Sequence, residues 1–281
     1  MRQPGQPSVH ALRKAARLIE GADMLLFVTS AGMGVDSGLP DFRGNQGFWR
    51  AYPALGDAGI DFYSIASPHA FRRNPELAWG FYGHRLGLYR RIIPHAGYDI
   101  LRSWGENSLC GYMALTTNVD GHFQKSGFED KLVAECHGSI HYLQCLEACS
   151  DEIWPADGFM PEINEKECLL LNEPPRCPHC GGLARPNILM FGDGDWLERR
   201  SASQLKRLDH WLHEADRLLV IEVGAGTAVS TARDFTHRVA FEHRAPVIRI
   251  NPRDAAIHGN AGHVSLAMGG LQALEEINAL L

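Results

Sequence analysis

The stretch Val28-Thr-Ser-Ala-Gly-Met-Gly-Val-Asp-Ser-Gly-Leu-Pro-Asp-Phe-Arg-Gly44 decides how the rest of the chain is organised. It follows an apolar run that begins at Met24, which predicts a buried parallel strand bounded by turn residues. The strand breaks at Ser30, and the glycines after it tolerate close approach of the backbone. A strand that ends in glycines before a helix gathers N–H groups that can hold a pyrophosphate. The spacing does not fit G-x-G-x-x-G strictly, so a structural turn is an equal alternative from the glycines alone.

Composition narrows the class of protein. A chain of 281 residues with 45% hydrophobic and 21% charged residues is typical of a globular protein of roughly two domains. The formal net charge of −6 argues against direct nucleic-acid binding, which needs a basic surface. The first 20 residues carry four basic side chains and no apolar core, and no apolar run is long enough to span a bilayer. We therefore expect no membrane partner and a cytoplasmic protein.

Buried strands and helices alternate along the chain, which predicts an open parallel α/β sheet. Further strands are expected at Leu109–Asn118, Lys131–Glu135, Leu218–Val223 and Val247–Ile250. Helices are expected from Ser8 to Gly21, from Pro75 to about Tyr89, around Leu205–Leu212 and over Leu271–Leu281, with short helices and loop over 44–68. Residues 139–184 are expected to be rich in loops.

Candidate ligand-binding residues follow the predicted strands directly. Ligands of open α/β sheets bind beyond the carboxyl ends of the strands, so this shared position is more informative than any one motif. The residues at these ends are Gly32, Asn118, His137, Gly224 and Asn251.

The seven cysteines are an odd number, and we expect no disulfide framework in a cytoplasmic chain. Cys110 and Cys136 are interpreted as small buried apolar side chains. Two close pairs, Cys145/Cys149 and Cys177/Cys180, predict a structural zinc site, with Cys168 as a possible substitute ligand. Four thiolates leave no open position on the metal, so a catalytic role for it is not expected. The alternative is a set of unpaired reduced cysteines.

The whole glycine stretch resembles the cofactor loop of the sirtuin family, which reads close to Gly-Ala-Gly-x-Ser-x-x-Ser-Gly-Ile-Pro-Asp-Phe-Arg. Ser30 and Gly34 depart from that pattern. The resemblance implies NAD as cofactor, with Ala31 and Gly32 near its phosphates. Phe42 and Arg43 would lie on a mobile flap over the nicotinamide. The matching residues are Ala31, Gly32, Ser37, Gly38, Pro40, Asp41, Phe42 and Arg43.

Two further motifs resemble the sirtuin reaction centre. Thr116-Thr-Asn-Val-Asp120 is similar to Thr-Gln-Asn-Ile-Asp, which implies that Asn118 binds the ribose or an ordered water and Asp120 helps to hold the nicotinamide amide. Thr117 stands where the family has Gln and is too short to span the same distance. His137-Gly-Ser resembles the family's His-Gly motif, which implies that His137 is the base for a ribose hydroxyl.

The second half of the chain continues the resemblance. Arg185-Pro-Asn-Ile-Leu-Met-Phe-Gly-Asp193 is similar to the family's Leu-Arg-Pro-x-Val-Val-x-Phe-Gly-Glu. We expect unpaired backbone at Phe191 and Gly192 to accept an extended substrate by β-augmentation. Gly224-Ala-Gly-Thr-Ala-Val229 and Asn251 occupy the places that contact the adenosine half, and Gly226 lacks the hydroxyl found there.

Tyr82 and Arg85 lie three residues apart, on one face of the predicted helix after Pro75. Sirtuins that remove acidic acyl groups show Tyr-x-x-Arg in a similar context, which implies recognition of an acyl carboxylate. The alternative is a solvated Arg85 beside a core aromatic residue.

Together these resemblances imply an NAD-dependent protein lysine deacylase, either a deacetylase or a desuccinylase/demalonylase. It would act on acylated-lysine proteins or peptides and release nicotinamide and O-acyl-ADP-ribose. The expected fold is a doubly wound, Rossmann-like parallel sheet (8–47, 95–139 and 186–281) with a smaller inserted domain (48–94 and 140–185). Two alternatives are an NAD glycohydrolase or ADP-ribosyltransferase on the same fold, and a non-catalytic NAD-sensing module.

Overall fold

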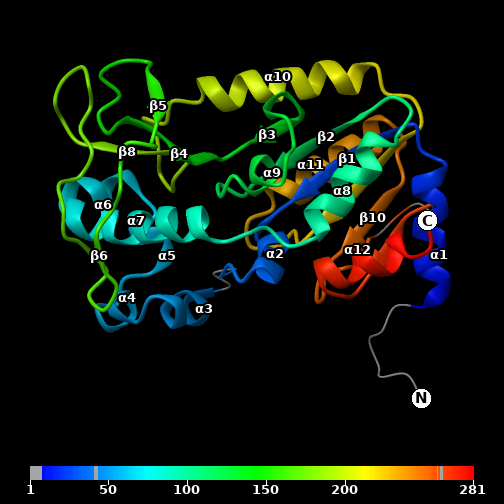
Figure 1. The fold of residues 1–281 in the computed structure, drawn as a ribbon, viewed down its shortest axis with the longest axis horizontal. Coiled ribbons are helices and arrows are strands. Elements are labelled where there is room, and N and C mark those ends of the chain that lie inside the picture. The colour runs from blue at the N-terminus through cyan, green and yellow to red at the C-terminus, as the bar shows by residue number, and fades with distance from the viewer. Residues whose placement is uncertain (1–7, 41–43, 258, 260–261) are drawn as a thin grey trace.

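A six-stranded parallel sheet forms the centre of the computed structural model, which describes residues 8–40, 44–257, 259 and 262–281 (Figure 1). Its strand order is β11-β10-β9-β1-β2-β3. The strands are β1 (Met24–Thr29), β2 (Tyr112–Thr116), β3 (Val133–Glu135), β9 (Leu218–Val223), β10 (Val247–Ile250) and β11 (Val264–Leu266). From β1 the chain builds β2 and β3 outward on one side, and then crosses to build β9, β10 and β11 on the other. The predicted doubly wound sheet is therefore confirmed, and the order reverses at β1, where such sheets bind ligands.

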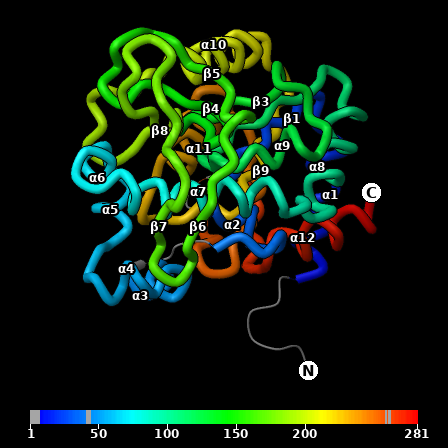
Figure 2. The backbone as a smooth tube through the Cα atoms, turned by 60° about the vertical axis from the view of Figure 1, so that its left-hand side comes forward, coloured from blue at the N-terminus to red at the C-terminus, as the bar shows by residue number. Residues whose placement is uncertain are grey.

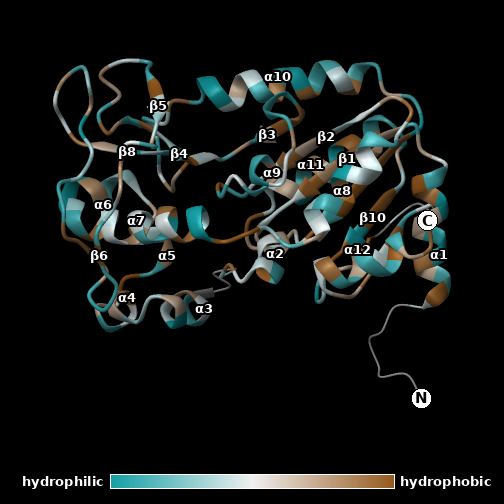
Figure 3. Cartoon of the chain, in the orientation of Figure 1, coloured by the Kyte–Doolittle hydropathy of each residue, from teal (hydrophilic) through white to brown (hydrophobic). Residues whose placement is uncertain are grey.

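Alternate side chains of β1 enter two different cores, because successive residues of a strand point to opposite faces. Leu25 and Phe27 pack among residues of α1 (Val9–Glu20), α8 (Gly97–Glu106) and α12 (Gly270–Asn278). Leu26 and Val28 pack against α10 (Arg199–His213) and α11 (Thr231–Glu242). Both faces of the sheet are thus covered by helices. Figure 3 shows hydrophilic and hydrophobic residues alternating along α10, one of these covering helices.

A second, largely helical region with its own apolar core lies beside the sheet. Its core is rich in aromatic residues, with Phe48, Trp79 and Phe81 fully buried. The helices are α3 (Gly44–Ala51), α4 (Pro53–Asp57), α5 (Phe62–Ile65), α6 (Pro68–Arg73) and α7 (Pro75–Arg91). Short helices α2 (Ala31–Gly34) and α9 (His122–Lys125) follow β1 and β2, with 3-10 turns at Val35–Ser37 and Asp130–Leu132.

Residues 138–188 add two small antiparallel sheets to this region. The first has the order β5-β4-β8, and the second pairs β6 with β7. Figure 2 shows the β6–β7 hairpin passing in front of α7, and both of its strands contact that helix. The strands are β4 (Gly138–Cys145), β5 (Ile153–Pro155), β6 (Ile163–Asn164), β7 (Leu169–Leu170) and β8 (Ala184–Ile188). The domain bounds expected from the sequence remain a prediction.

The structure corrects the sequence prediction in several places. Residues 139–184 are rich in loops, as predicted, but they also hold strands that were not predicted, among them β4, which pairs with both β5 and β8. Its register shifts between Ser139 and Leu143, and this irregularity hides the period of two that marks a strand. The second strand of the large sheet begins at Tyr112 and not at Leu109, whose side chain is 81% exposed. The elements α8, α11 and β11 were not predicted.

Among the described residues, no helix is long and apolar enough to cross a membrane.

Candidate active site

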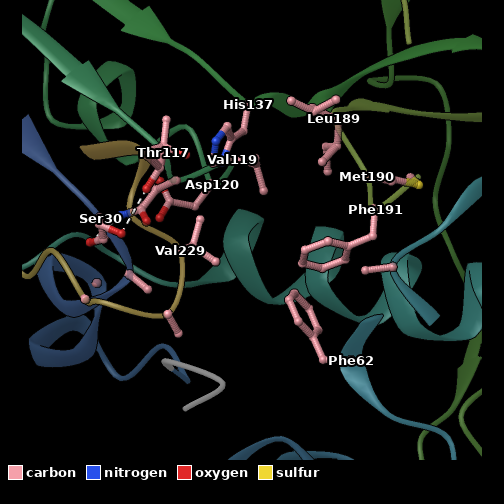
Figure 4. A pocket seen from close by; sticks show the side chains of 18 of the residues that line it. Ser30, Phe62, Thr117, Val119, Asp120, His137, Leu189, Met190, Phe191 and Val229 are labelled. Carbon is pink, nitrogen blue, oxygen red and sulfur yellow. Dashed lines mark hydrogen bonds between the residues drawn. The ribbon is translucent and has the colours of Figure 1, made fainter. Parts of the chain in front are cut away.

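A cavity of about 880 Å³ opens beyond the carboxyl ends of β1, β2 and β9 and reaches across to α7 and the segment after β8. Figure 4 shows Ser30, Thr117, Asp120 and His137 on one side of it, and Phe62, Leu189, Met190 and Phe191 on the other. Most of the predicted site residues line this one cavity. They are Ala31, Gly32, Tyr82, Arg85, Thr117, Asn118, Asp120, His137, Phe191, Gly192, Gly224 and Gly226. Asp41, Phe42 and Arg43 lie outside the described residues.

The glycines after β1 and β9 form a bare backbone edge of the cavity. A Cβ atom on Gly32 would come within 2.6 Å of Gly224 Cα, and one on Gly224, whose φ is +71°, within 2.4 Å of the Gly32 carbonyl carbon. The Gly32 N–H donates to the Gly224 carbonyl over 3.1 Å. The two glycines therefore fix each other's position, a constraint that the sequence pattern does not reveal. Gly226 faces open space, so the edge there can be approached closely.

The ends of β1 and β2 are joined by side chains as well as by the backbone. Thr29 and Thr116, partners in the register, are hydrogen-bonded through their hydroxyls over 2.9 Å. The Asn118 backbone N–H donates to Thr116 Oγ1 over 3.0 Å, and Asn118 Nδ2 donates to the Ser30 carbonyl over 3.1 Å. These bonds orient the Asn118 side chain at the strand end, beside the cavity.

His137 lies between β3 and β4, where Gly138 allows the chain to turn sharply. Gly138 has a φ of +80°, and a Cβ there would come within 2.1 Å of the Asn187 carbonyl oxygen, so no other residue fits. Burial lowers the pKa of His137 below its usual value, although a hydrogen bond to the backbone of Thr117 opposes the shift. The imidazole is therefore neutral at physiological pH and can accept a proton.

Asp120 is held in place by its own loop. Its side chain is 7% exposed, and Oδ1 accepts a hydrogen bond from the His122 backbone N–H over 2.9 Å. Its carbonyl is bonded to His141 Nε2 over 2.9 Å. The carboxylate thus reaches the cavity from a fixed backbone.

Asn251 does not line the cavity but lies fully buried behind it. Its Nδ2 donates to the Ala225 carbonyl over 2.7 Å, and its Oδ1 accepts from the backbone N–H groups of Arg253 and Asp254. Arg233, which the sequence prediction missed, donates to the carbonyls of Ala225, Gly226 and Asp254. Both side chains act on the loops that line the cavity, and such partners could not be found from local sequence patterns.

The opposite wall of the cavity carries Arg85, which is only 9% exposed, so the alternative of a solvated arginine is wrong. Its Nε and Nη2 donate to the Tyr89 hydroxyl over 2.9 and 2.8 Å. Tyr89, one helical turn beyond Arg85, also lines the cavity and was not predicted. The guanidinium lies 5.3–5.7 Å from the ring centroids of Phe81, Tyr82 and Tyr89.

In the segment after β8, backbone N–H groups that were expected to be unpaired form hydrogen bonds within the protein. The Phe191 N–H donates to the Ala66 carbonyl over 2.9 Å, so it does not offer a free donor to a substrate strand. The preceding N–H groups of Leu189 and Met190 donate to the His137 carbonyl and to Asp193 Oδ2. The expectation of unpaired backbone at Phe191 is therefore wrong. These bonds fix the segment between the small helices and His137.

A buried ion pair also fixes the segment that follows β8. Arg185 Nη1 and Nη2 donate to the two carboxylate oxygens of Asp193 over 2.7 and 2.8 Å, and neither side chain is exposed. The carboxylate also accepts the N–H groups of Met190 and Asp195. Asp193 therefore joins the strand β8 to the wall of the cavity.

We predict that Asp193→Asn destabilises the protein strongly. The amide keeps the shape of the side chain but leaves the buried Arg185 charge uncompensated, which typically costs about 3–5 kcal/mol. The midpoint of thermal unfolding should fall by roughly 10 °C. Glu147→Gln, which breaks the exposed pair with Arg72, is the matched control and should have little effect. Equal shifts for both variants would show that burial of the Arg185–Asp193 pair is not important.

Four cysteines converge at the far end of the β5-β4-β8 sheet. The ligand atoms of Cys145, Cys149, Cys177 and Cys180 all lie within 4.8 Å of one another. The Sγ atoms of Cys145 and Cys180 are 3.7 Å apart, and those of Cys149 and Cys177 are 3.5 Å apart. Tetrahedral zinc with Zn–S bonds of about 2.3 Å separates its sulfurs by about 3.8 Å, so this arrangement can hold the metal.

The remaining cysteines do not belong to this cluster. Cys168 is buried, and its carbonyl oxygen lies so close to Gly80 of α7 that a Cβ there would approach it to 1.9 Å. It packs against the helix and is not a substitute ligand. Cys110 is exposed, which contradicts the interpretation of a buried side chain, whereas Cys136 is half-buried.

Comparisons with known proteins agree with this geometry. A model of the Sir2 family matches residues 30–231. An NAD-dependent protein deacylase of Aquifex aeolicus is 34% identical over 236 residues, which cover 83% of this chain and 85% of that protein. The protein of the same name from Thermococcus kodakarensis is 30% identical over 262 residues, which cover 90% of this chain and 92% of that protein.

Solved structures share the fold. The crystal structure of a Sir2 homologue in complex with NAD has a TM-score of 0.75 at 23% identity and covers 99% of this chain and 95% of its own. A Sir2 structure with a deacetylated p53 peptide and 3'-O-acetyl ADP-ribose has a TM-score of 0.65 at 17% identity, with coverage of 95% and 96%.

Proposed function

Because the chain belongs to the Sir2 family, we propose that it is an NAD-dependent protein lysine deacylase that uses His137 as its general base. The proposal rests mainly on one observation. The same cavity is lined by the glycine edge at Gly32, by the polar residues at the strand ends and, on its opposite wall, by residues of α7 that would face the acyl group. The relatives named as NAD-dependent protein deacylases cover most of this chain. We also propose a cytoplasmic location, where thiolates stay reduced and can bind zinc.

The residues present fit NAD. The Gly32–Gly224 edge offers backbone without side chains, which suits a pyrophosphate, and Gly226 leaves open space beside it. When bound, NAD supplies the ribosyl group that takes up the acyl chain, with nicotinamide as the leaving group. Asp120 lies on the same side of the cavity as His137 (Figure 4), and Asn118, which follows the end of β2, lines the same cavity.

His137 is the residue that would move the proton. With NAD bound, its neutral ring would accept the proton of a ribose hydroxyl and so act as the general base. The hydrogen bond to the backbone of Thr117 keeps the ring oriented toward the strand end. The Leu189 N–H bonds the His137 carbonyl, so the base and the substrate-side segment are held at a fixed distance from each other.

The direct test is incubation of the protein with NAD and an acylated-lysine peptide. We expect nicotinamide and O-acyl-ADP-ribose in equal amounts, measured by mass spectrometry, and both only when the peptide is present. Rapid nicotinamide release from NAD alone would support the glycohydrolase alternative. Binding of NAD without any turnover would support the non-catalytic module.

The pH dependence of the reaction should reflect the environment of His137. Burial lowers the pKa of this imidazole below its usual 6.5, so the neutral, base-competent form persists to lower pH than for an exposed histidine. We predict that kcat/KM is constant through neutral pH and falls only below pH 6.5, as the ring takes up a proton. An acid limb centred above pH 6.5 would contradict this assignment.

We further propose that the enzyme prefers acidic acyl groups such as succinyl or malonyl. Arg85 presents a positive charge at the cavity wall within a cage of aromatic rings, where a carboxylate meets little competing water. Tyr82 lines the cavity beside it, and burial raises its pKa to about 12, so its phenol remains a hydrogen-bond donor. A planar guanidinium suits a terminal carboxylate better than a methyl group.

Arg85→Met should therefore reverse the acyl preference. Hydrogen bonds to a charged group contribute roughly 1.5–3 kcal/mol, so kcat/KM for a succinyl-lysine peptide should fall by about one to two decades. Turnover of the acetyl-lysine peptide should stay similar or improve. Arg91→Met, which changes an exposed arginine of the same helix, is the matched control and should leave both substrates unaffected. Wild-type protein that hydrolyses acetyl-lysine as efficiently as succinyl-lysine would refute the preference.

A further inference from the structure

Side chains of α10 hold the end of β3, the strand at one edge of the large sheet, two residues before His137. Glu135 is the last residue of β3. Its backbone N–H donates to Gln204 Oε1 over 3.0 Å, and its carbonyl accepts from the Ser201 hydroxyl over 2.8 Å. Arg200 Nη2 donates to Glu135 Oε2 over 2.6 Å. The helix therefore satisfies backbone groups of the kind that an edge strand exposes.

The three α10 residues act from one face of the helix, because residues three and four apart are neighbours on a helix surface. Figure 1 shows α10 running over β3, and the two elements are in contact. Ser201 and Gln204 are buried, and so is Glu135. Water does not compete for these hydrogen bonds, so they hold the end of β3 in one place.

Arg200 also reaches the strand that follows His137. The centre of its guanidinium lies 4.2 Å from the centroid of the Tyr142 ring on β4. Arg200 Nη1 and Glu135 Oε1 are buried and have no hydrogen-bond partner within the described part of the chain, so the pair does not form the stronger two-bond fork. The guanidinium lies between β3 and β4 instead. His137 is in the turn that joins these two strands, and one arginine contacts both of them.

We infer that Arg200, Ser201 and Gln204 are positioning residues for the general base. None of the three lines the cavity, so they act through Glu135 and the turn and not on the reacting groups. Only Cys136 separates Glu135 from His137, and a displacement of the strand end therefore moves the imidazole. This inference rests on the proposed function, since it assumes that His137 is the base.

The test measures steady-state kinetics of the full-length protein with NAD and the acylated-lysine peptide that the wild type turns over. A misplacement of about 1 Å can cost about a hundredfold in rate, so kcat should fall about tenfold in Ser201→Ala and up to about a hundredfold in Arg200→Met. The KM for NAD should stay unchanged, because the glycine edge is untouched. Arg200→Lys, which keeps a positive charge opposite Glu135, should recover most of the lost kcat.

A second readout separates the base from the earlier step. Exchange of labelled nicotinamide into NAD, with acylated peptide present, should continue at the wild-type rate in Ser201→Ala and Arg200→Met. The reason is that the base acts after nicotinamide has left, in the order that the family resemblance implies. A loss confined to turnover therefore points to a misplaced base.

The controls come from the same helix. Ser203→Ala and Arg207→Met change exposed residues and should leave kcat unchanged. Leu208→Ala removes a fully buried side chain that packs under α10 but makes none of the bonds to Glu135. It should lower the melting temperature and yet keep the wild-type kcat at temperatures where the protein is folded. This variant distinguishes loss of position from loss of stability.

Wild-type kcat in both Ser201→Ala and Arg200→Met would overturn the inference and leave the proposed function standing. So would a parallel loss of turnover and exchange, or a fall in kcat in Leu208→Ala as large as that in Ser201→Ala. If Arg200→Met does not fold, Ser201→Ala decides the question, because it removes one neutral hydrogen bond. Unchanged deacylation in His137→Ala, or wild-type protein without any turnover, would overturn the proposed function and this inference with it.

Discussion

His137→Ala should remove nearly all deacylation while leaving NAD binding within a few fold. Proton transfer by a positioned side chain typically contributes a factor of about 10²–10⁴, so the loss in kcat should be of that order. NAD affinity should survive because the glycine edge and Asn118 are unchanged. The bond from the Leu189 N–H to position 137 uses the backbone carbonyl, so alanine keeps it.

The order of events sharpens this test. The base acts on a ribose hydroxyl after nicotinamide has left, in the order that the family resemblance implies. Exchange of labelled nicotinamide into NAD, in the presence of acylated peptide, should therefore continue in His137→Ala. His210→Ala, on the exposed face of α10, is the control and should turn over normally. Unchanged deacylation in His137→Ala would refute the assignment of His137 as the base.

Cys177→Ser should lower both the zinc content and the stability of the protein. Cys145 ends β4 and Cys149 follows it, whereas Cys177 and Cys180 precede β8. Backbone hydrogen bonds such as that from the Leu146 N–H to the Leu183 carbonyl join the two segments, and a metal would add a link through the side chains. Binding of structural zinc contributes about 10 kcal/mol or more in small modules, so the effect on unfolding should exceed that of any other single change proposed above. Thermal unfolding and elemental analysis of the same preparation measure the two effects together.

Cys110→Ser is the matched control, because this cysteine is exposed and outside the cluster. It should keep one zinc per chain and the wild-type melting temperature. Cys168→Ala should also keep its zinc, since Cys168 packs against α7. Wild-type protein that contains no zinc by elemental analysis and is fully folded would refute the metal site.

The large sheet was predictable because its central strands are short, wholly buried and mostly apolar runs, in which the only charged residues are the paired Glu222 and Arg249. Every residue of β1, β2, β9 and β10 is buried, and each run ends at a turn residue or a polar motif. The strand β11 has three residues with an exposed serine between two buried ones, which is too short for a periodic signal. The strand β4 was not predicted for a different reason. Its register shift interrupts the alternation of side chains between the two faces of the sheet.

The candidate site was predictable where it depends on position in the chain. Asn118 and His137 follow strands directly, and parallel strands bring their carboxyl ends together. Arg233 and Tyr89 were missed because their importance comes from the partners they meet in space, the loop carbonyls and the Arg85 guanidinium. The same holds for the role of Gly32, whose need to be glycine comes from Gly224.

The contact between Gly32 and Gly224 also has a consequence for synthesis on the ribosome. The two residues come from opposite halves of the chain, and the edge that they form requires β9 to be paired with β1. A nascent chain can complete β1 and β2 early, but it has no place for a dinucleotide until β9 has emerged and inserted beside β1. Non-local pairing of this kind slows folding, because the intervening loop must close first. Binding of a dinucleotide therefore requires the completed sheet. It stabilises the complete sheet and none of the shorter intermediates that lack β9.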